Sequence, residues 1–129
     1  MILAATGGAE WRFRITMGKH VLIVEDDELV ADHLAALVRD QLGCVPVVAG
    51  TAGDAMALAA EQVDFSFLDI KLSDGLTFPL AQHLRARGVP FVFVSASDPA
   101  RVPADLAQAP FLRKPVPAPR LLAVAREHL

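Results

Sequence analysis

Charged and hydroxyl side chains follow four apolar segments of the sequence, each at the point where the apolar run ends. The residues at these points are Glu25-Asp26-Asp27, Asp69, Ser95 and Arg113-Lys114. Carboxylates, a hydroxyl and a lysine are the groups that bind a cation and stabilise a phosphoryl group. They can do so only if the fold brings them together.

Carboxylates that converge on one point repel each other unless a cation lies between them. Oxygen ligands without histidine or cysteine favour Mg²⁺ over zinc, and the histidines of this chain show no shared ligand spacing. A Mg²⁺ ion held by one or two carboxylates keeps several waters and leaves room for a phosphate oxygen. The acidic residues therefore predict a Mg²⁺ site.

Asp69 is the candidate nucleophile, because a carboxylate can attack phosphorus and form an acyl phosphate. It needs no general base, since it is already ionised at neutral pH. Phosphoryl transfer then depends on positioning and on neutralising the charge of the phosphoryl oxygens. Lys114 can supply a positive charge for one of these oxygens, and the hydroxyl of Ser95 can donate a hydrogen bond to another.

The elements that must position these residues alternate along the chain. Apolar runs predict five strands, at 21–24, 45–49, 65–68, 91–94 and 111–112. Segments with helical spacing predict helices from Asp27 to about 42, from 51 to about 62, from about 76 to 87 and from about 119 to 129. Short connections of this kind require right-handed parallel crossovers, which predicts a doubly wound α/β fold with a five-stranded parallel sheet. In such sheets functional residues gather at the carboxyl ends of the strands.

Two segments depart from this alternation. Pro99 and Pro103 interrupt the stretch between the last two strands, so it has room for one or two helical turns at most. Residues 1–17 precede the first strand, and we predict one domain over residues 18–129. The extension is either a poorly packed tail or an added strand that pairs with another surface or subunit.

Composition limits the function classes. The chain has 129 residues, of which 53% are hydrophobic and 21% charged, which suits one folded domain. Its net charge is −3 and its basic residues are scattered, which argues against a nucleic-acid surface. No apolar run approaches the ~20 residues of a membrane span, and the N-terminus makes a poor signal peptide. Cys44 is the only cysteine, so no intrachain disulfide forms, and we expect a cytoplasmic protein.

The chain resembles the response-regulator receiver domains of two-component signalling. The segments that carry the resemblance are VLIVEDDE, FLDIKLSDG, VFVSA and FLRKP, in this order between Lys19 and Leu129. The resemblance implies a flavodoxin-like sheet with strand order 2-1-3-4-5. It also points to stand-alone bacterial receivers with a shortened fourth helix.

The resemblance assigns metal ligands by position. It implies that Asp69 is the phosphoacceptor and a Mg²⁺ ligand, and that Asp26 binds the metal directly. Glu25 is implied to act through a water molecule. Lys71 is implied to offer its backbone carbonyl, so that its side chain is incidental.

The resemblance also assigns the residues that respond to the phosphoryl group. Lys114 and Ser95 are implied to contact it, and Ser95 and Phe111 to act as the switch pair. Phe111 stands where many receivers have tyrosine, so it lacks the hydroxyl. Pro115 is implied to follow a cis peptide bond, and Ser73 stands where many receivers have proline.

Simpler interpretations exist for several of these residues. Asp26 and Asp27 could only cap the following helix, and we leave Asp27 as a cap. Ser95 could stabilise a turn, and Phe111 could be an ordinary core residue. His33 lies near the apolar face of its helix, and we expect it at the edge of the core.

We therefore expect a phosphorylation-dependent binding module that receives its phosphoryl group from a sensor histidine kinase or a His phosphotransfer protein. Its only chemistry would be self-phosphorylation and autodephosphorylation. We expect output through an unknown protein partner, without nucleic acid or membrane, and a homodimer remains open.

Three alternative functions can each be distinguished from this one by a single sequence feature. An aspartyl phosphatase needs a second acid at the position of Lys71. A flavin or nucleotide binder needs a phosphate loop where Glu25-Asp26-Asp27 stand. A degenerate receiver, which only binds partners, would lack part of the acidic pocket.

Overall fold

The computed structural model of the chain describes residues 18–129. The extension predicted at residues 1–17 lies outside this range. Five parallel strands form the central sheet, namely β1 (His20–Val24), β2 (Val45–Ala49), β3 (Phe65–Leu68), β6 (Phe91–Ser95) and β7 (Phe111–Arg113). Within the described range the α-helices are α2 (Glu28–Asp40), α3 (Ala52–Ala59), α4 (Phe78–Ala86) and α5 (Ala118–His128). None of these helices is long and apolar enough to cross a membrane.

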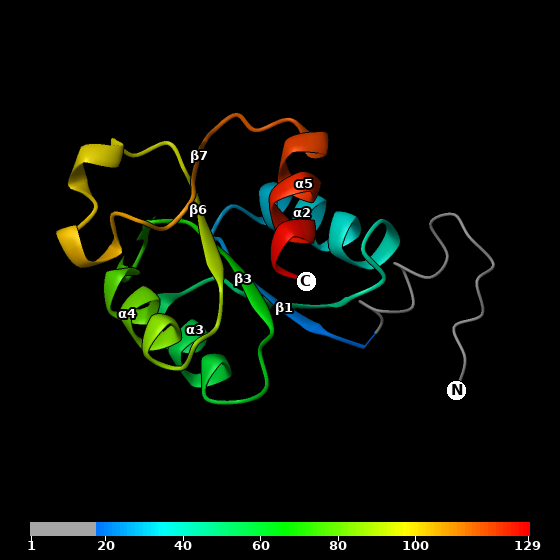
Figure 1. Cartoon of the computed structure of the whole chain (residues 1–129), viewed down its shortest axis with the longest axis horizontal. Coiled ribbons are helices and arrows are strands. Elements are labelled where there is room, and N and C mark those ends of the chain that lie inside the picture. The colour runs from blue at the N-terminus through cyan, green and yellow to red at the C-terminus, as the bar shows by residue number, and fades with distance from the viewer. Residues whose placement is uncertain (1–17) are drawn as a thin grey trace.

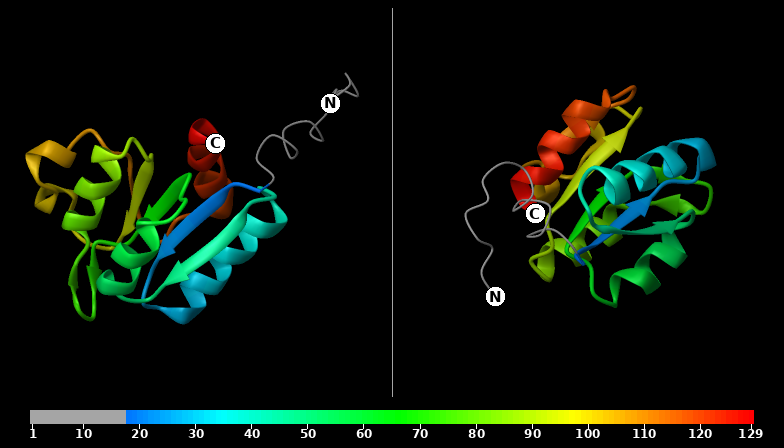
Figure 2. Two further views of the ribbon diagram at one scale, coloured as in Figure 1. Left: turned by 90° about the horizontal axis from the view of Figure 1, so that it is seen from below. Right: turned by 90° about the vertical axis from the view of Figure 1, so that its right-hand side faces the viewer.

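The strands follow one another across the sheet in the order β2-β1-β3-β6-β7. Counted along the sheet strands alone, this is the predicted order 2-1-3-4-5, so the flavodoxin-like doubly wound fold is confirmed. Helices α2 and α5 cover one face of the sheet and α3 and α4 the other (Figures 1 and 2).

Alternate side chains of each inner strand enter two separate cores. In β1, Val21 and Ile23 pack against α2 and α5, whereas Leu22 and Val24 pack against α3 and α4. A strand with helices on both sides buries every residue, which explains why its sequence is a continuous apolar run rather than an alternating one.

Side chains of the loops start the first two helices. The carboxylate of Asp27 accepts hydrogen bonds from the amides of Leu29 and Val30, and so caps α2 as predicted. Thr51 caps α3 in the same way through the amide of Asp54. Helix α3 ends at Ala59, earlier than the predicted end near 62.

A short hairpin between β3 and α4 was not predicted. Strands β4 (Lys71–Leu72) and β5 (Gly75–Leu76) pair antiparallel where we expected a loop followed directly by a helix. The turn contains Gly75 at φ +143, a conformation that glycine adopts readily. Leu76, where the predicted helix was expected to begin, lies instead in β5 and is half exposed.

The region of the predicted shortened helix contains only two single turns of 3-10 helix, η1 (Pro99–Arg101) and η2 (Ala104–Leu106). The prediction from the two prolines is therefore confirmed. The side chains of Gln82 and Arg85 in α4 both donate hydrogen bonds to Asp105. These contacts hold η2 against α4, and Leu106 of the same turn enters the core.

Candidate functional site

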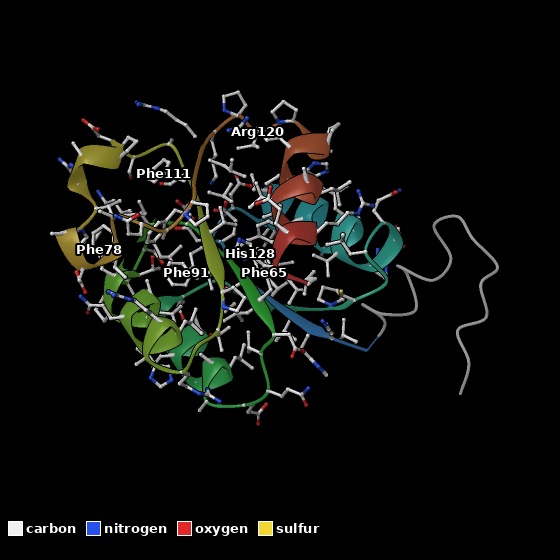
Figure 3. All side chains as sticks on the ribbon, viewed as in Figure 1. Phe65, Phe78, Phe91, Phe111, Arg120 and His128 are labelled. Carbon is white, nitrogen blue, oxygen red and sulfur yellow. The ribbon has the colours of Figure 1, made fainter. Side chains whose placement is uncertain are left out.

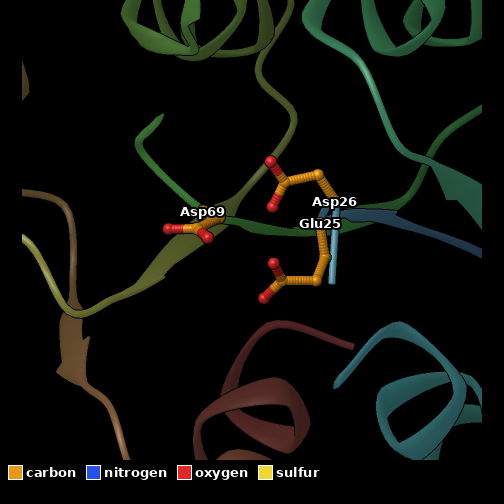
Figure 4. A group of neighbouring side chains, drawn as sticks. All are labelled: Glu25, Asp26 and Asp69. Carbon is orange, nitrogen blue, oxygen red and sulfur yellow. The ribbon is translucent and has the colours of Figure 1, made fainter. Parts of the chain in front are cut away.

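Three carboxylates converge at the carboxyl edge of the sheet. Glu25 and Asp26 follow β1 and Asp69 follows β3, and these two strands are neighbours. One oxygen of each residue lies within 4.8 Å of the others, and Figure 4 shows the three side chains around a common space. Glu25 is buried, Asp69 is half-buried and Asp26 is exposed. The predicted acidic cluster is therefore present.

Lys114 reaches this cluster from the end of β7. Its ammonium group donates hydrogen bonds to Oε1 of Glu25 and, over 3.1 Å, to Oδ2 of Asp69. Its backbone amide donates to the carbonyl of Ser95, which connects the ends of β7 and β6. One lysine thus offsets part of the negative charge of two carboxylates.

Burial and the contacts within this group shift the pKa of two members. Burial raises the pKa of Glu25, and the hydrogen bond from Lys114 opposes this rise without cancelling it. Burial disfavours the charged form of Lys114, but the hydrogen bond to Glu25 and the charge of Asp69 outweigh burial and raise its pKa. Lys114 therefore holds its proton more firmly than a free lysine does.

Backbone contacts set the position of the candidate nucleophile. Asp69 donates its amide to the carbonyl of Val24, and its Oδ1 accepts a hydrogen bond of 2.8 Å from the amide of Ile70. Thr77, which is fully buried, donates its hydroxyl to the carbonyls of Asp69 and Ile70. Thr77 was not predicted from the sequence to support the site. The one sequence feature that could have indicated this role is a hydroxyl residue directly before α4.

Ser95 and Phe111 lie near the site but do not join the acidic cluster. Ser95 is buried at the end of β6, and its Oγ accepts a hydrogen bond of 3.1 Å from the amide of Ser97. Phe111, labelled in Figure 3, is half-buried in β7. The centroid of its ring is 6.1 Å from that of Phe93. Their roles as a switch pair remain predictions.

The structure also locates the remaining residues that the sequence singled out. Asp27 caps α2, and its amide donates to Oε2 of Glu25. Lys71 begins β4 with an exposed side chain, and the role of its carbonyl stays a prediction. The Lys114-Pro115 peptide bond is cis, as the resemblance implied. The expectation for His33 was wrong, because it is exposed at the helix surface.

The donor set fits a hard divalent cation. All three clustered side chains offer carboxylate oxygens, and Lys114 leaves both oxygens of Asp26 without an ammonium partner among the described residues. Zinc prefers nitrogen or sulfur ligands, which the cluster lacks. The residues present therefore suit Mg²⁺, which binds through few carboxylates and keeps part of its water shell.

An apolar groove of about 510 Å³ borders the site. Leu29, Val30 and Leu34 of α2 form one wall, and Lys114, Pro115 and Val116 form the opposite wall. Leu29 is an apolar residue of α2 that is 82% exposed. The groove is continuous with the acidic cluster, because Lys114 belongs to both.

Comparisons with known proteins agree with this geometry. The sequence model of a family described as "Response regulator receiver domain" matches residues 21–126. No curated protein matches the chain.

Solved structures of similar fold cover most of the chain. The receiver domain of RstA from Klebsiella pneumoniae, in its BeF3-activated form, is 28% identical with a TM-score of 0.72, and covers 85% of this chain and 97% of its own. A CheY-like receiver domain from Methylobacillus flagellatus is 25% identical with a TM-score of 0.71, covering 87% of this chain and 99% of its own. TrrA from Thermotoga maritima, a response regulator in complex with Mg²⁺-BeF, is 17% identical with a TM-score of 0.75, covers 86% of this chain and 99% of its own, and shows the shared fold alone.

Proposed function

The chain belongs to the response regulator receiver domain family, and we propose that it accepts a phosphoryl group on Asp69 from a phosphohistidine protein in a Mg²⁺-dependent reaction. The observation that carries the proposal is the cluster of Glu25, Asp26 and Asp69 with Lys114 hydrogen-bonded to two of its members. The BeF3-activated form of the RstA receiver domain, which is 28% identical to this chain, supports the proposal.

Asp26 and Asp69 would hold the Mg²⁺ directly, Glu25 would hold it through water, and Lys71 would add its backbone carbonyl. When bound, the ion supplies positive charge beside the phosphoryl oxygens. The clustered oxygens and the exposure of Asp26 support this assignment, since a cation can reach them from solvent.

Asp69 would act as the nucleophile. One of its carboxylate oxygens forms a bond to phosphorus while the bond between phosphorus and the imidazole nitrogen of the donor breaks, and the imidazole leaves with the electron pair. Ile70 and Thr77 hold Asp69 in place through the hydrogen bonds described above. Lys114 then moves its hydrogen bonds from carboxylate oxygens to a phosphoryl oxygen, which keeps the charge balanced.

Ser95 and Phe111 would communicate phosphorylation to the surface. The Oγ of Ser95 accepts only the Ser97 amide among the described contacts and has a hydroxyl proton to donate. Turning this hydroxyl toward the phosphoryl group releases the Ser97 loop and opens space beside Phe111. Such a switch shifts an existing equilibrium between two arrangements.

The groove beside Lys114 would receive the phosphodonor. A phosphohistidine must come within bonding distance of Asp69, so the surface of its protein must cover the mouth of the site. The exposed side chain of Leu29 and the apolar wall formed with Val116 offer this partner a contact that is continuous with the acidic cluster. We propose a helix of a sensor histidine kinase or His phosphotransfer protein as the occupant.

The proposal includes no enzymatic activity beyond self-phosphorylation and autodephosphorylation. Output would proceed through contacts with another protein in the cytoplasm. A homodimer is one form that this contact can take.

The test uses acetyl phosphate as donor, with and without Mg²⁺, and intact-mass spectrometry of the full chain. We expect one added phosphoryl group that requires both Mg²⁺ and Asp69, and no adduct on Asp69→Ala. Asp40→Ala, which removes an exposed carboxylate at the far end of α2, is the matched control and should be phosphorylated normally. An adduct that persists on Asp69→Ala, or no adduct with either acetyl phosphate or a phosphorylated His phosphotransfer protein, would overturn the proposal.

A further inference from the structure

Asp74, in the turn between β4 and β5, binds the first turn of α3. Its Oδ1 accepts a hydrogen bond of 2.8 Å from the amide of Ala52, and its Oδ2 accepts one of 3.1 Å from the amide of Gly53. Thr51 satisfies the next amide, that of Asp54. The first amides of a helix have no partner within the helix, so a carboxylate from a distant loop is well suited to them.

The base of the hairpin and one of its strand residues are anchored separately from its tip. Thr77 holds the carbonyls of Asp69 and Ile70, and Leu72 enters the core beside α4. An isolated two-stranded hairpin is only marginally stable in water. The turn itself contains Ser73 rather than a stiffening proline, so Asp74 is the residue that ties its tip to the domain.

The hydrogen bonds of Asp74 complete a series of contacts that links Asp69 to Glu25. From Asp69 the chain runs through the hairpin to Asp74 and crosses to the start of α3. From there Gly50 leads back to Ala49, whose carbonyl accepts a hydrogen bond of 3.0 Å from the amide of Glu25. The segments that carry the cluster from β1 and from β3 are thus connected a second time, through the hairpin, the start of α3 and the end of β2.

We propose that Asp74 is a positioning residue for the Mg²⁺ site, because it holds the hairpin that follows Asp69 at a set distance from the segment that carries Glu25. The inference rests on the proposed function, since it assigns the metal to this cluster. Asp74 lies outside the cluster itself and acts through the backbone. Its loss weakens Mg²⁺ binding without removing a ligand.

The experiment compares Asp74→Ala with Asp54→Ala on the full chain. Asp54 is exposed in the first turn of the same helix, so both changes remove one negative charge from the same region. Mg²⁺ binding is measured by isothermal titration calorimetry without a phosphodonor. We expect the dissociation constant to rise about tenfold for Asp74→Ala relative to Asp54→Ala, as for other residues that orient metal ligands. Asp74→Asn, which keeps one acceptor oxygen, should fall between them.

A second measurement separates positioning from a loss of folding. The Mg²⁺ concentration that gives half the maximal rate of phosphorylation should rise by the same factor for Asp74→Ala, while the rate at saturating Mg²⁺ stays that of Asp54→Ala. Urea unfolding without Mg²⁺ confirms that the variants are folded at the assay temperature.

Equal Mg²⁺ dissociation constants for Asp74→Ala and Asp54→Ala would overturn the inference and leave the proposed function intact. A lower rate for Asp74→Ala at saturating Mg²⁺ would also overturn it. Wild-type chain that binds Mg²⁺ but takes no phosphoryl group would overturn the proposed function alone. Wild-type chain that binds no Mg²⁺ would overturn both.

Discussion

The ammonium nitrogen of Lys114 lies 3.1 Å from a carboxylate oxygen of Asp69, although the two residues are 45 positions apart in the chain. The same nitrogen also binds Glu25, so a single cation serves two acids at adjacent strand ends. The lysine side chain is 23% exposed and that of Glu25 only 3%. Because these charged groups are largely buried, each stabilises the other in the folded chain. The free energy of unfolding of variants can measure this contribution.

Lys114→Met should lower the free energy of unfolding by about 1–3 kcal/mol without Mg²⁺, because the substitution leaves Glu25 charged and without its cationic partner. Mg²⁺ should restore part of this loss, since it binds the folded chain alone. Urea unfolding with and without Mg²⁺ tests both points. A variant as stable as wild type in the absence of Mg²⁺ would contradict the prediction.

The contact of Lys114 with Glu25 and Asp69 should also make the free energy of unfolding depend on pH in the alkaline range. The pKa of Lys114 is raised above the value of 10.5 for a free lysine, so the folded chain keeps this proton where the unfolded chain has released it. The stabilisation is therefore complete below pH 10.5 and is lost as the pH rises through the raised pKa.

The measurement is the difference in unfolding free energy between wild type and Lys114→Met as the pH increases. The chain contains no tyrosine, so no phenol titrates in this range. We expect the difference to shrink above pH 10.5, whereas a constant difference would show that the lysine charge contributes nothing.

Thr77→Val should destabilise the fold by about 1–3 kcal/mol, because it leaves the carbonyl of Asp69 without its hydroxyl partner in a buried place. The substitution keeps the volume of the side chain, so no cavity forms. Thr77→Ser is the control, since it keeps the hydroxyl and loses one methyl group, at about 1 kcal/mol. The measurement is the midpoint of urea unfolding. A larger decrease for Thr77→Ser than for Thr77→Val would argue against this role of the hydroxyl.

Leu29→Ala should slow phosphorylation by a phosphohistidine protein about tenfold, because it removes apolar contact area from the rim of the groove. Phosphorylation by acetyl phosphate should not change, since a small donor does not need the groove. Stability should also be unchanged, because the side chain is 82% exposed. Val48→Ala on the outer strand β2 is the control. If Leu29→Ala slowed phosphorylation equally with both donors, the substitution would act on the phosphorylation site rather than on docking of the partner protein.

Local pattern was sufficient to predict the sheet and the ends of its strands. The run at 21–24 is apolar throughout and the run at 65–68 contains one polar residue, Ser66, as expected of strands covered on both faces. Neighbouring parallel strands bring their carboxyl ends together by geometry, so Glu25, Asp26 and Asp69 had to meet. The end of α3 was predicted less well, because residues 60–62 (Ala-Glu-Gln) contain no glycine or proline to mark the end of the helix.

The sequence by itself therefore determined the fold, the three acids and the lysine that approaches them, because these depend on periodicity and on residue type at strand ends. Only the tertiary structure showed that Thr77 supports Asp69, that Asp74 ties the hairpin to α3 and that Leu29 stands on an open groove. Each of these contacts joins residues brought together by packing, at distances of a few ångströms. Hydrophobic pattern is nearly the same whether a leucine lies in the core or at the rim of a groove, so such contacts leave no local signal.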